Sequence, residues 1–262
     1  MGRRLAVNPI PYWSRGGRID KSPAVFDEAF ADFAEIGFTA VNADVPDGMN
    51  AADYLDWIGS YGLTPALSLF NSPFDETIDI TEEVERAKKF AATQVELGLD
   101  RTMISSMAIP GRMARPAVGA DFNTDRLRLA IENCGIICQV LQSEGLRPLH
   151  HSHVGGVFET EHEITTLLDE LGPDVIGFGP DTGHLRWAGI EPATFIRRYA
   201  DRLGVAFTSR TSSTTTSTPS RVHPGRTTSW RRPSGCGASR ASESSISTPC
   251  WRCCRTTTTA TS

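Results

Sequence analysis

Residues 147–156 read Arg-Pro-Leu-His-His-Ser-His-Val-Gly-Gly, and residues 175–184 read Val-Ile-Gly-Phe-Gly-Pro-Asp-Thr-Gly-His. Each stretch begins as a short apolar segment with the length of a buried strand and then becomes polar. Between them, residues 161–171 carry apolar side chains at helical spacing, and Thr160 with Glu163 forms a capping box at the helix start. The three pieces predict a strand, a helix and a second strand, with polar side chains where each strand ends.

The same alternation extends over residues 1–206. Strands are expected at 5–8, 40–42, 64–69, 102–106, 147–151 and 175–179, with a seventh beginning at Gly204, and helices at 25–37, 51–61, 81–97, 125–144, 161–171 and 191–201. Such alternation is typical of a parallel sheet, either doubly wound or closed into a barrel. The glycine-rich phosphate signatures of doubly wound folds are absent from the sequence. We therefore expect an α/β fold, a (β/α)8 TIM barrel that is incomplete after the seventh strand.

Composition excludes several classes of protein. The chain has 262 residues, 39% hydrophobic and 22% charged, as in soluble globular enzymes. No apolar run reaches the roughly 18 residues of a membrane span, so we expect no membrane partner and a cytoplasmic location. Residues 207–262 hold 8 of the 26 basic and 1 of the 31 acidic residues, which leaves 18 against 30, or about −12, in residues 1–206. A body of that charge repels phosphate backbones, so no nucleic-acid partner is expected.

The end of the fifth strand carries a cluster of histidines. Alternation places His151 and His153 on one face and His150 on the other. Two neutral imidazoles at this spacing suit a divalent metal or a polyhydroxylated substrate. The alternative is a polar loop in which the histidines are incidental.

The end of the sixth strand adds an acid and a further histidine. Asp181 and His184 are spaced to supply one metal ligand and one group that handles a proton or binds a hydroxyl. The alternative is that Asp181 only caps the turn. Glu159 and Glu161 follow the fifth strand, and we assign Glu161 to the solvated start of the helix.

These motifs together resemble the xylose isomerase-like barrel superfamily, and within it the sugar phosphate isomerase/epimerases and inosose dehydratases. The resemblance covers about residues 4–206 and rests on His-Ser-His-Val-Gly-Gly, Glu-Thr-Glu, Pro-Asp-Thr-Gly-His-Leu and Arg-Tyr-Ala-Asp-Arg within 151–202. It implies one divalent metal, manganese or cobalt first, with zinc and magnesium as alternatives. Carried over by position, Asp181 is a metal ligand and His184 a substrate contact. The first ligand position falls on His151, where the family has a glutamate.

The resemblance implies a metal-dependent sugar or sugar phosphate isomerase/epimerase that abstracts a proton α to a carbonyl. His153 and His184 are expected to bind substrate hydroxyls, and Glu159 and His184 are the candidates for proton transfer. The expected partner is a small sugar or cyclitol. The sequence is compatible with a homo-oligomer as well as with a single chain. An inosose dehydratase and a non-catalytic sugar-binding relative are the alternative functions.

The composition changes abruptly near Phe207. Ser and Thr make up 27 of the 56 residues from 207 to 262. The family continues with His-Leu-Lys-Asp-Val where this chain has Phe207-Thr-Ser-Arg-Thr-Ser-Ser213. Codons such as TTC ACC TCA AGG ACG TCT TCC encode the printed residues, and the same bases read from the third position give His-Leu-Lys-Asp-Val-Phe. We therefore interpret residues from about 207 onward as a frameshifted translation.

The frameshift hypothesis has consequences for the printed chain. A shifted tail lacks the family's third ligand and its eighth strand, so we expect a disordered segment at 207–262 and little or no activity. The alternatives are a natural Ser/Thr-rich linker, or zinc held by Cys250, Cys253, Cys254 and Cys236 or His223. Sequencing the coding DNA across codon 207 separates these possibilities.

Overall fold

The computed structural model describes residues 5–16 and 18–204. The chain divides into two compact units, Met1–Ser213 and Thr214–Ser262, and every described residue belongs to the first. The predictions of a frameshifted, disordered tail and of a missing eighth strand therefore lie outside the described residues. So does the alternative of a zinc site in the tail.

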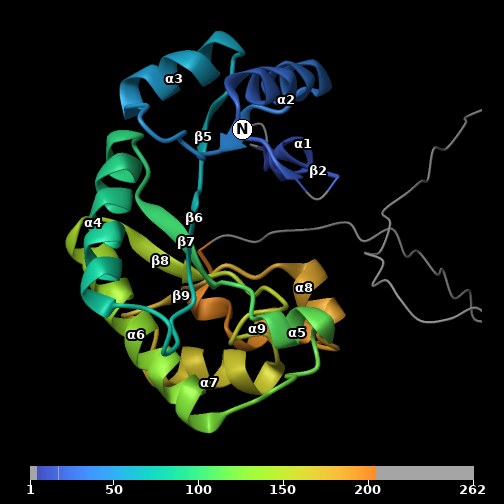
Figure 1. The fold of residues 1–262 in the computed structure, drawn as a ribbon, viewed down its shortest axis with the longest axis vertical. Helices are drawn as coiled ribbons and strands as arrows, with labels where there is room; N and C mark the ends of the chain where they lie inside the picture. The colour runs from blue at the N-terminus through green and yellow to red at the C-terminus, as the bar shows by residue number, and fades with distance from the viewer. Residues whose placement is uncertain (1–4, 17, 205–262) are drawn as a thin grey trace, which may run out of the picture. The chain divides into compact units, whose positions relative to one another are not determined.

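Parallel strands follow one another across the sheets in chain order (Figure 1). One sheet has the order β1 (Ala6–Val7), β4 (Ala40–Asn42) and β5 (Thr64–Ala66), and the other has β6 (Leu69–Ser72), β7 (Arg101–Ser106), β8 (Arg147–His150) and β9 (Gly177–Phe178). All these pairings are parallel. Phe178 also pairs in parallel with Leu203, beside the position predicted for a seventh strand. The chain-order parallel ladder is that of a βα-barrel wall.

The two sheets meet where a single stretch of chain runs from β5 into β6. Residues 64–66 pair with β4, and residues 69–72 pair with β7. The Asn42 side chain donates a hydrogen bond to the Leu67 carbonyl between them. The predicted third strand is thus one extended segment. Its first half pairs with β4, and its second half pairs with β7.

The six predicted helices are confirmed, five of them with ends within two residues of those expected. They are α2 (Pro23–Ile36), α3 (Ala51–Ser60), α4 (Ile80–Glu96), α6 (Thr124–Ser143), α7 (Glu161–Leu171) and α9 (Pro192–Arg198). The capping box of Thr160 and Glu163 at the start of α7 is also confirmed. The sixth helix is shorter than predicted, because α9 ends at Arg198 and a 3-10 turn, η1 (Ala200–Arg202), follows.

Several short elements were not predicted. They are α1 (Ile10–Trp13), the hairpin of β2 (Ser14–Arg15) with β3 (Arg18–Ile19), α5 (Pro110–Ala114) and α8 (Thr182–Trp187). Elements of two to six residues are too short to display a period in the sequence. All of them lie in segments that follow the carboxyl end of a strand, which is where βα-barrel proteins place their chemistry.

The core consists of two apolar clusters that the helices build against the strands. One cluster joins α2, α3 and β4 and is rich in aromatic rings, including Phe26, Phe30 and Tyr54. The other joins α4, α6 and α7 to strands β6 to β9. It includes the buried, unpaired thiols of Cys134 and Cys138. Of the described helices, none is both long and apolar enough to cross a lipid bilayer.

Candidate functional site

Three potential metal ligands converge just beyond the ends of β8 and β9. His151 follows the last residue of β8, while Asp181 and His184 lie at the start of α8. One ligand atom from each of the three lies within 4.8 Å of the others. His151 and Asp181 are buried, and His184 is half-buried. The residues come from two successive βα units, 30 positions apart, so the parallel sheet brings them together.

Backbone hydrogen bonds fix the two strand ends that carry these side chains. The His151 amide donates to the Ile104 carbonyl on β7 at 2.9 Å, and the Gly179 amide donates to the His150 carbonyl at 2.9 Å. The sheet pairing therefore continues one residue past the formal ends of β8 and β9. The backbone positions of His151 and of the end of β9 are therefore set by the sheet.

Asp181 caps the helix that carries His184. Its Oδ1 accepts hydrogen bonds from the amides of Gly183 at 2.7 Å and His184 at 3.0 Å. Asp181 therefore caps the turn, as the alternative interpretation of the sequence held. It is compatible with metal binding, because a carboxylate has two oxygens and about four lone pairs. The cap also sets the direction of the first turn of α8 and with it the His184 side chain.

His153 and His184 stack beside the ligand group. Their ring centroids lie 3.9 Å apart, and the centroid of His151 lies 6.2 Å from that of His153 and 6.1 Å from that of His184. The Nδ1 atom of His153 lies 2.7 Å from the Val154 carbonyl oxygen. Since a carbonyl only accepts, Nδ1 carries the proton, and in the neutral ring the lone pair is on Nε2. His153 is exposed, so its ring can be reached from solvent.

The electrostatic environment keeps the buried imidazoles neutral at physiological pH. Burial lowers the pKa of His151 to about 4, and the neighbouring His153 and His184 act in the same direction, while Asp181 opposes them. Burial also lowers the pKa of His184 to about 4, with His153 adding to it and Asp181 opposing it. Neutral imidazole is the form that binds metal ions. The site therefore does not have to lose protons from these two rings at neutral pH before it takes up a cation.

His150 points away from the cluster, as the alternation of the strand predicts. Its ring is 1% exposed and meets Phe158 edge-on at 5.9 Å between centroids. Burial, with a smaller contribution from His151, lowers the pKa of His150 to about 3. His150 is thus a neutral core histidine.

Glu159 has surroundings that differ from those of the three ligands. The side chain is 1% exposed, and its two oxygens accept hydrogen bonds from the amides of Ala117 at 2.9 Å, Gly119 at 2.8 Å and Gly155 at 2.7 Å. A base that abstracts a substrate proton needs a lone pair directed at the substrate. The expected role of Glu159 in proton transfer therefore finds no support in this geometry.

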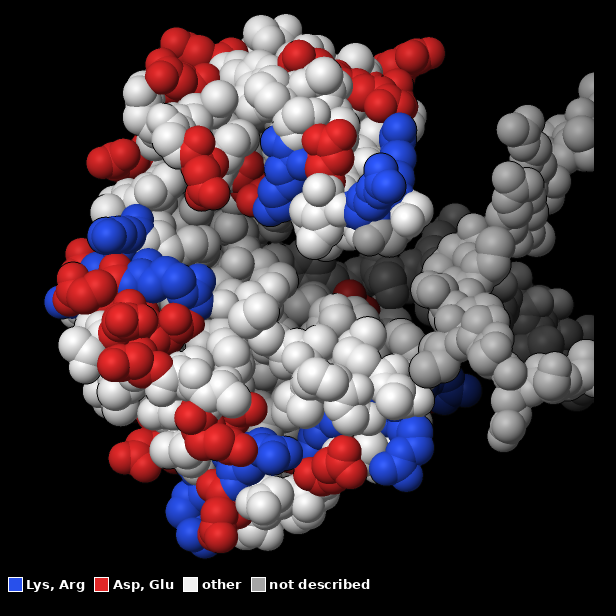
Figure 2. All heavy atoms as spheres, viewed as in Figure 1, with Lys and Arg blue, Asp and Glu red and all other residues white. Residues whose placement is uncertain are grey.

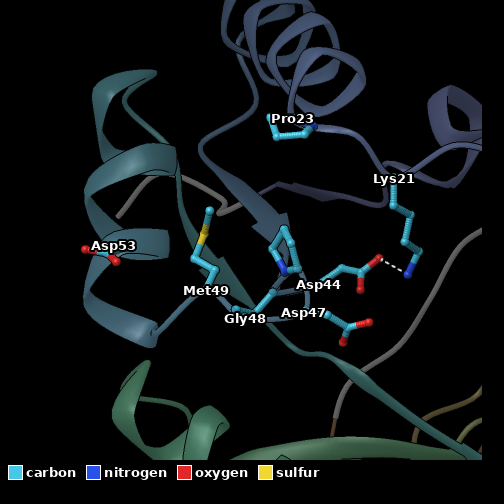
Figure 3. Close-up of a pocket in the computed structure, with 9 residues that line it drawn as sticks. Lys21, Pro23, Asp44, Asp47, Gly48, Met49 and Asp53 are labelled. Carbon is cyan, nitrogen blue, oxygen red and sulfur yellow. Dashed lines mark hydrogen bonds and ion pairs between the residues drawn. The ribbon is translucent and has the colours of Figure 1, made fainter.

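A hollow of about 620 Å³ opens at the carboxyl end of β4 (Figure 3). Its lining includes Lys21, Asp44, Asp47, Met49 and Asp53. Within it the Lys21 ammonium donates to the Asp44 carboxylate at 2.7 Å, and the close-up shows the two side chains extended toward each other. This hollow and the histidine cluster both follow carboxyl ends of parallel strands, although they use different strands.

Charged side chains of both signs are interspersed on the visible face of the described residues (Figure 2). Exposed ion pairs among the described residues include Arg15 with Glu28 and Arg186 with Glu191. Exposed pairs of this kind contribute little to stability. Because the two signs are interspersed, the described residues on this face present no continuous basic stripe of the kind that follows a nucleic-acid backbone.

The fold and the strand-end cluster define a βα-barrel protein with a polar site at the carboxyl edge of its sheet. Comparison with known proteins gives the family: the profile described as xylose isomerase-like TIM barrel matches residues 30–226. The chain belongs to this family, which confirms the predicted fold class and the resemblance.

Several relatives are enzymes that act on cyclitols or sugars. Inosose dehydratase 1 of Bacillus cereus is 34% identical over 208 residues, which is 76% of this chain and 68% of that protein. The crystal structure of a D-allulose 3-epimerase from Methylomonas sp. in complex with D-allulose superposes with a TM-score of 0.59 at 16% identity, over 79% of this chain and 73% of that one. The IOLI protein with a bound zinc atom superposes with a TM-score of 0.57 at 10% identity, over 79% and 72%. The chain spans 59–68% of the length of the first curated relatives that it matches.

Sequence reasoning missed two features of the site. It expected His184 as a substrate contact and a candidate for proton transfer, and it did not predict that a ligand atom of His184 would lie within 4.8 Å of those of His151 and Asp181. The signal was present, since residues i and i+3 at the first turn of a helix lie on one side. It also overlooked Arg112, which is 1% exposed and binds the segment after β8. No local pattern marks that arginine, because its partners lie 8 to 51 residues away.

Proposed function

We propose that this chain is a metal-dependent isomerase or epimerase that acts α to the carbonyl of a sugar or cyclitol. The observation that carries the proposal is the convergence of His151, Asp181 and His184 within 4.8 Å at the carboxyl edge of the sheet. We further propose a cytoplasmic location and a small polyhydroxylated substrate. The D-allulose in the Methylomonas epimerase structure supports that substrate class.

The residues fit a divalent cation. Two imidazole nitrogens and one carboxylate oxygen are the donor set that zinc, manganese and cobalt accept, and three protein ligands leave positions open for substrate oxygens. The zinc atom of the IOLI structure supports a metal in this fold. Manganese or cobalt remain our first expectation for this chain, with zinc and magnesium as alternatives.

The metal ion and the side chains around the proposed ligands have different roles in the proposed reaction. A bound divalent ion supplies Lewis-acid polarisation of the carbonyl and its neighbouring hydroxyl. His153, with its lone pair on Nε2 and its exposed ring, accepts a hydrogen bond from a substrate hydroxyl or takes the α proton. Returning that proton to the neighbouring carbon, while a hydroxyl proton moves between the two oxygens in the opposite direction, gives isomerisation. Epimerisation requires a second acid on the opposite face of the same carbon, which delivers a proton there while His153 keeps the one it took. With His184 used as a ligand, we assign the proton transfer to His153 in place of His184, which was one of the two candidates expected from the sequence.

The test combines metal content with proton exchange on a substrate. The full chain is loaded with manganese, cobalt or zinc, dialysed and subjected to elemental analysis, beside a version with the reading frame restored after Ala206. We expect about one ion per chain in both, because all three ligands lie within 151–184, and tighter binding in the restored version. Ketoses and inososes are then incubated in D₂O, and deuterium at the α carbon is followed by NMR. We expect exchange to need metal and to be fastest in the restored chain. If neither version binds a metal ion and neither exchanges the α proton, the proposal is contradicted.

A dehydratase acting on an inosose is the second candidate. The 34% identity to inosose dehydratase 1 over 76% of this chain favours it. Both reactions begin with the same α-proton abstraction and differ in whether a β-hydroxyl then leaves. Formation of an unsaturated ketone from an inosose, followed by its ultraviolet absorbance, distinguishes dehydration from isomerisation. Tight sugar binding with no deuterium exchange would instead identify a non-catalytic sugar-binding relative.

A further inference from the structure

We propose that Glu159, Arg112 and Glu163 form a buried positioning cluster that fixes the histidine-bearing segment 151–160 in its metal-binding arrangement. The inference rests on the proposed function, because it assigns Glu159 and Arg112 a role toward the same metal site. It replaces the expectation that Glu159 transfers a proton.

Arg112 ties two loops together. It is 1% exposed and lies on α5, in the segment 107–123 between β7 and α6. Its guanidinium donates to the carbonyls of Ala120 at 3.1 Å, Gly156 at 2.8 Å and Val157 at 3.3 Å. It also donates to both oxygens of Glu163, at 3.0 Å and 2.5 Å. A planar guanidinium can satisfy this many directions at once, and an ammonium cannot.

Glu163 completes the connection on the other side. Besides the two bonds from Arg112, its Oε2 accepts from the amides of Glu159 at 3.1 Å and Thr160 at 2.9 Å. Its side chain is fully buried with that of Arg112. A buried charge pair of this kind is stable only when its remaining lone pairs and protons have partners, and here the backbone of the segment 151–160 provides them.

Glu159 connects this cluster to the histidines through a single peptide. Its Oε2 accepts from the Gly155 amide at 2.7 Å. The preceding residue, Val154, offers its carbonyl to His153 Nδ1 at 2.7 Å, and its amide lies 3.4 Å from His184 Nδ1. The position of Gly155 therefore determines where Val154 sits, and Val154 orients both imidazoles. Groups that orient metal ligands in this way influence metal affinity although they do not touch the ion.

The same carboxylate also holds the facing loop. The amides of Ala117 and Gly119 donate to Glu159, and Arg112 Nη1 lies 3.8 Å from Glu159 Oε1. Ile109 donates to the Gly155 carbonyl at 2.7 Å, a further link between the two segments. Displacing Glu159 would leave three buried or half-buried amides without an acceptor, which is costly. The Glu159 carboxylate is therefore held by both segments.

The test replaces Glu159 by glutamine in the full chain. An amide side chain has one oxygen and an NH₂ group, so at least one of the three backbone amides would face a donor. We expect E159Q to bind zinc or cobalt about 10 to 100 times more weakly, as is typical when a group behind a metal ligand is lost. Amide hydrogen exchange at Ala117, Gly119 and Gly155 should be faster, and the ¹⁵N signal of the His153 ring should show a mixture of tautomers. The matched control is Glu161→Gln, the same chemical change on an exposed acid two residues away.

A second variant guards against a Glu159 substitution that fails to fold. Arg112→Lys keeps the charge but cannot reach all five acceptor atoms, and it should weaken metal binding in the same direction. Unchanged metal affinity and an unchanged His153 tautomer in both variants, with only a lower urea midpoint, would overturn the inference in favour of a purely structural role. Loss of proton exchange in E159Q with unchanged metal affinity and amide protection would overturn it in favour of catalysis.

The failure of the proposed function gives a different result. If the unmodified chain binds no divalent ion, the metal proposal is wrong. The inference is then judged on the His153 tautomer and on the exchange of the three amides, both measured without metal. A change in both readouts in E159Q but not in E161Q still supports positioning of the imidazoles by Glu159. No change in them overturns it.

Discussion

The imidazole rings of His153 and His184 lie 3.9 Å apart between centroids, and the peptide of Val154 contacts both of them. One ring follows β8, and the other belongs to the first turn of α8, which is capped by Asp181. Burial lowers the pKa of His184, and the nearby His153 lowers it further because two protonated rings this close would repel each other. His184 is therefore neutral at neutral pH, and we propose that it binds the metal while His153 binds a substrate hydroxyl.

His153→Gln separates these two roles. Glutamine retains a hydrogen-bonding side chain but cannot take up a proton near neutral pH. We expect one metal ion per chain as before, and α-proton exchange slowed about 100-fold or more, the usual contribution of a positioned acid–base group. Metal content and deuterium incorporation are measured on the same preparation, with exposed His162→Gln as control. Loss of the metal in H153Q would make His153 a ligand instead.

Two substitutions of Asp181 distinguish its cap from its charge. Asparagine caps a helix as well as aspartate, so Asp181→Asn should leave the urea unfolding midpoint of the metal-free chain almost unchanged while abolishing stoichiometric metal binding. Asp181→Ala should lose the metal and, in addition, about 1 kcal/mol of stability through the missing cap. Equilibrium unfolding and elemental analysis check both statements. Stoichiometric metal in D181N would exclude Asp181 from the ligand set.

Much of this architecture could be predicted from local patterns. The capping box at Thr160 and the apolar periods gave the helices, and regular alternation gave the parallel sheet. The grouping of His184 with His151 was only partly visible, because it depends on the turn that Asp181 imposes.

The role of Glu159 could not be predicted in the same way. In sequence it is an acid after a strand, like any candidate base. Only the fold brings the amides of Ala117 and Gly119, about 40 residues earlier, onto its carboxylate. Likewise Arg112 looks like a surface cation in a Gly-Arg-Met segment, and its burial depends on acceptors from two other segments. Hydrogen bonds and ion pairs between buried groups that are far apart in the chain produce no periodic pattern and no local motif in the sequence.

The stability of the metal-free chain should fall below neutral pH because of His150. Its pKa is about 3 in the folded chain and about 6.5 when unfolded, so the unfolded chain binds more protons between these values. Stability is therefore fully present above pH 6.5 and decreases as the pH falls toward 3, with a slope of up to about 1.4 kcal/mol per pH unit from this group. Urea unfolding at several pH values measures the slope. His150→Leu should reduce this slope by up to about 1.4 kcal/mol per pH unit, the contribution of one titrating group. An identical slope in both chains would refute the assignment of the pH dependence to His150.

Gly156 should tolerate no side chain, because of a close approach to β7. A Cβ at this position would lie 2.0 Å from Ser106 Oγ and 2.9 Å from the Ser106 carbonyl oxygen. The carbonyl belongs to a strand paired on both sides and cannot shift freely, so we expect Gly156→Ala to lower the free energy of unfolding by about 1–3 kcal/mol. The matched control is Gly59→Ala in α3, where a Cβ meets nothing within 4 Å and helix propensity predicts a gain of about 0.5–1 kcal/mol. Because Gly156 also offers its carbonyl to Arg112, G156A should weaken zinc binding together with stability, whereas G59A should leave zinc binding unchanged. Both are read by urea unfolding and zinc titration, and a G156A chain with unaltered stability would mean that this loop is not held against β7 as described.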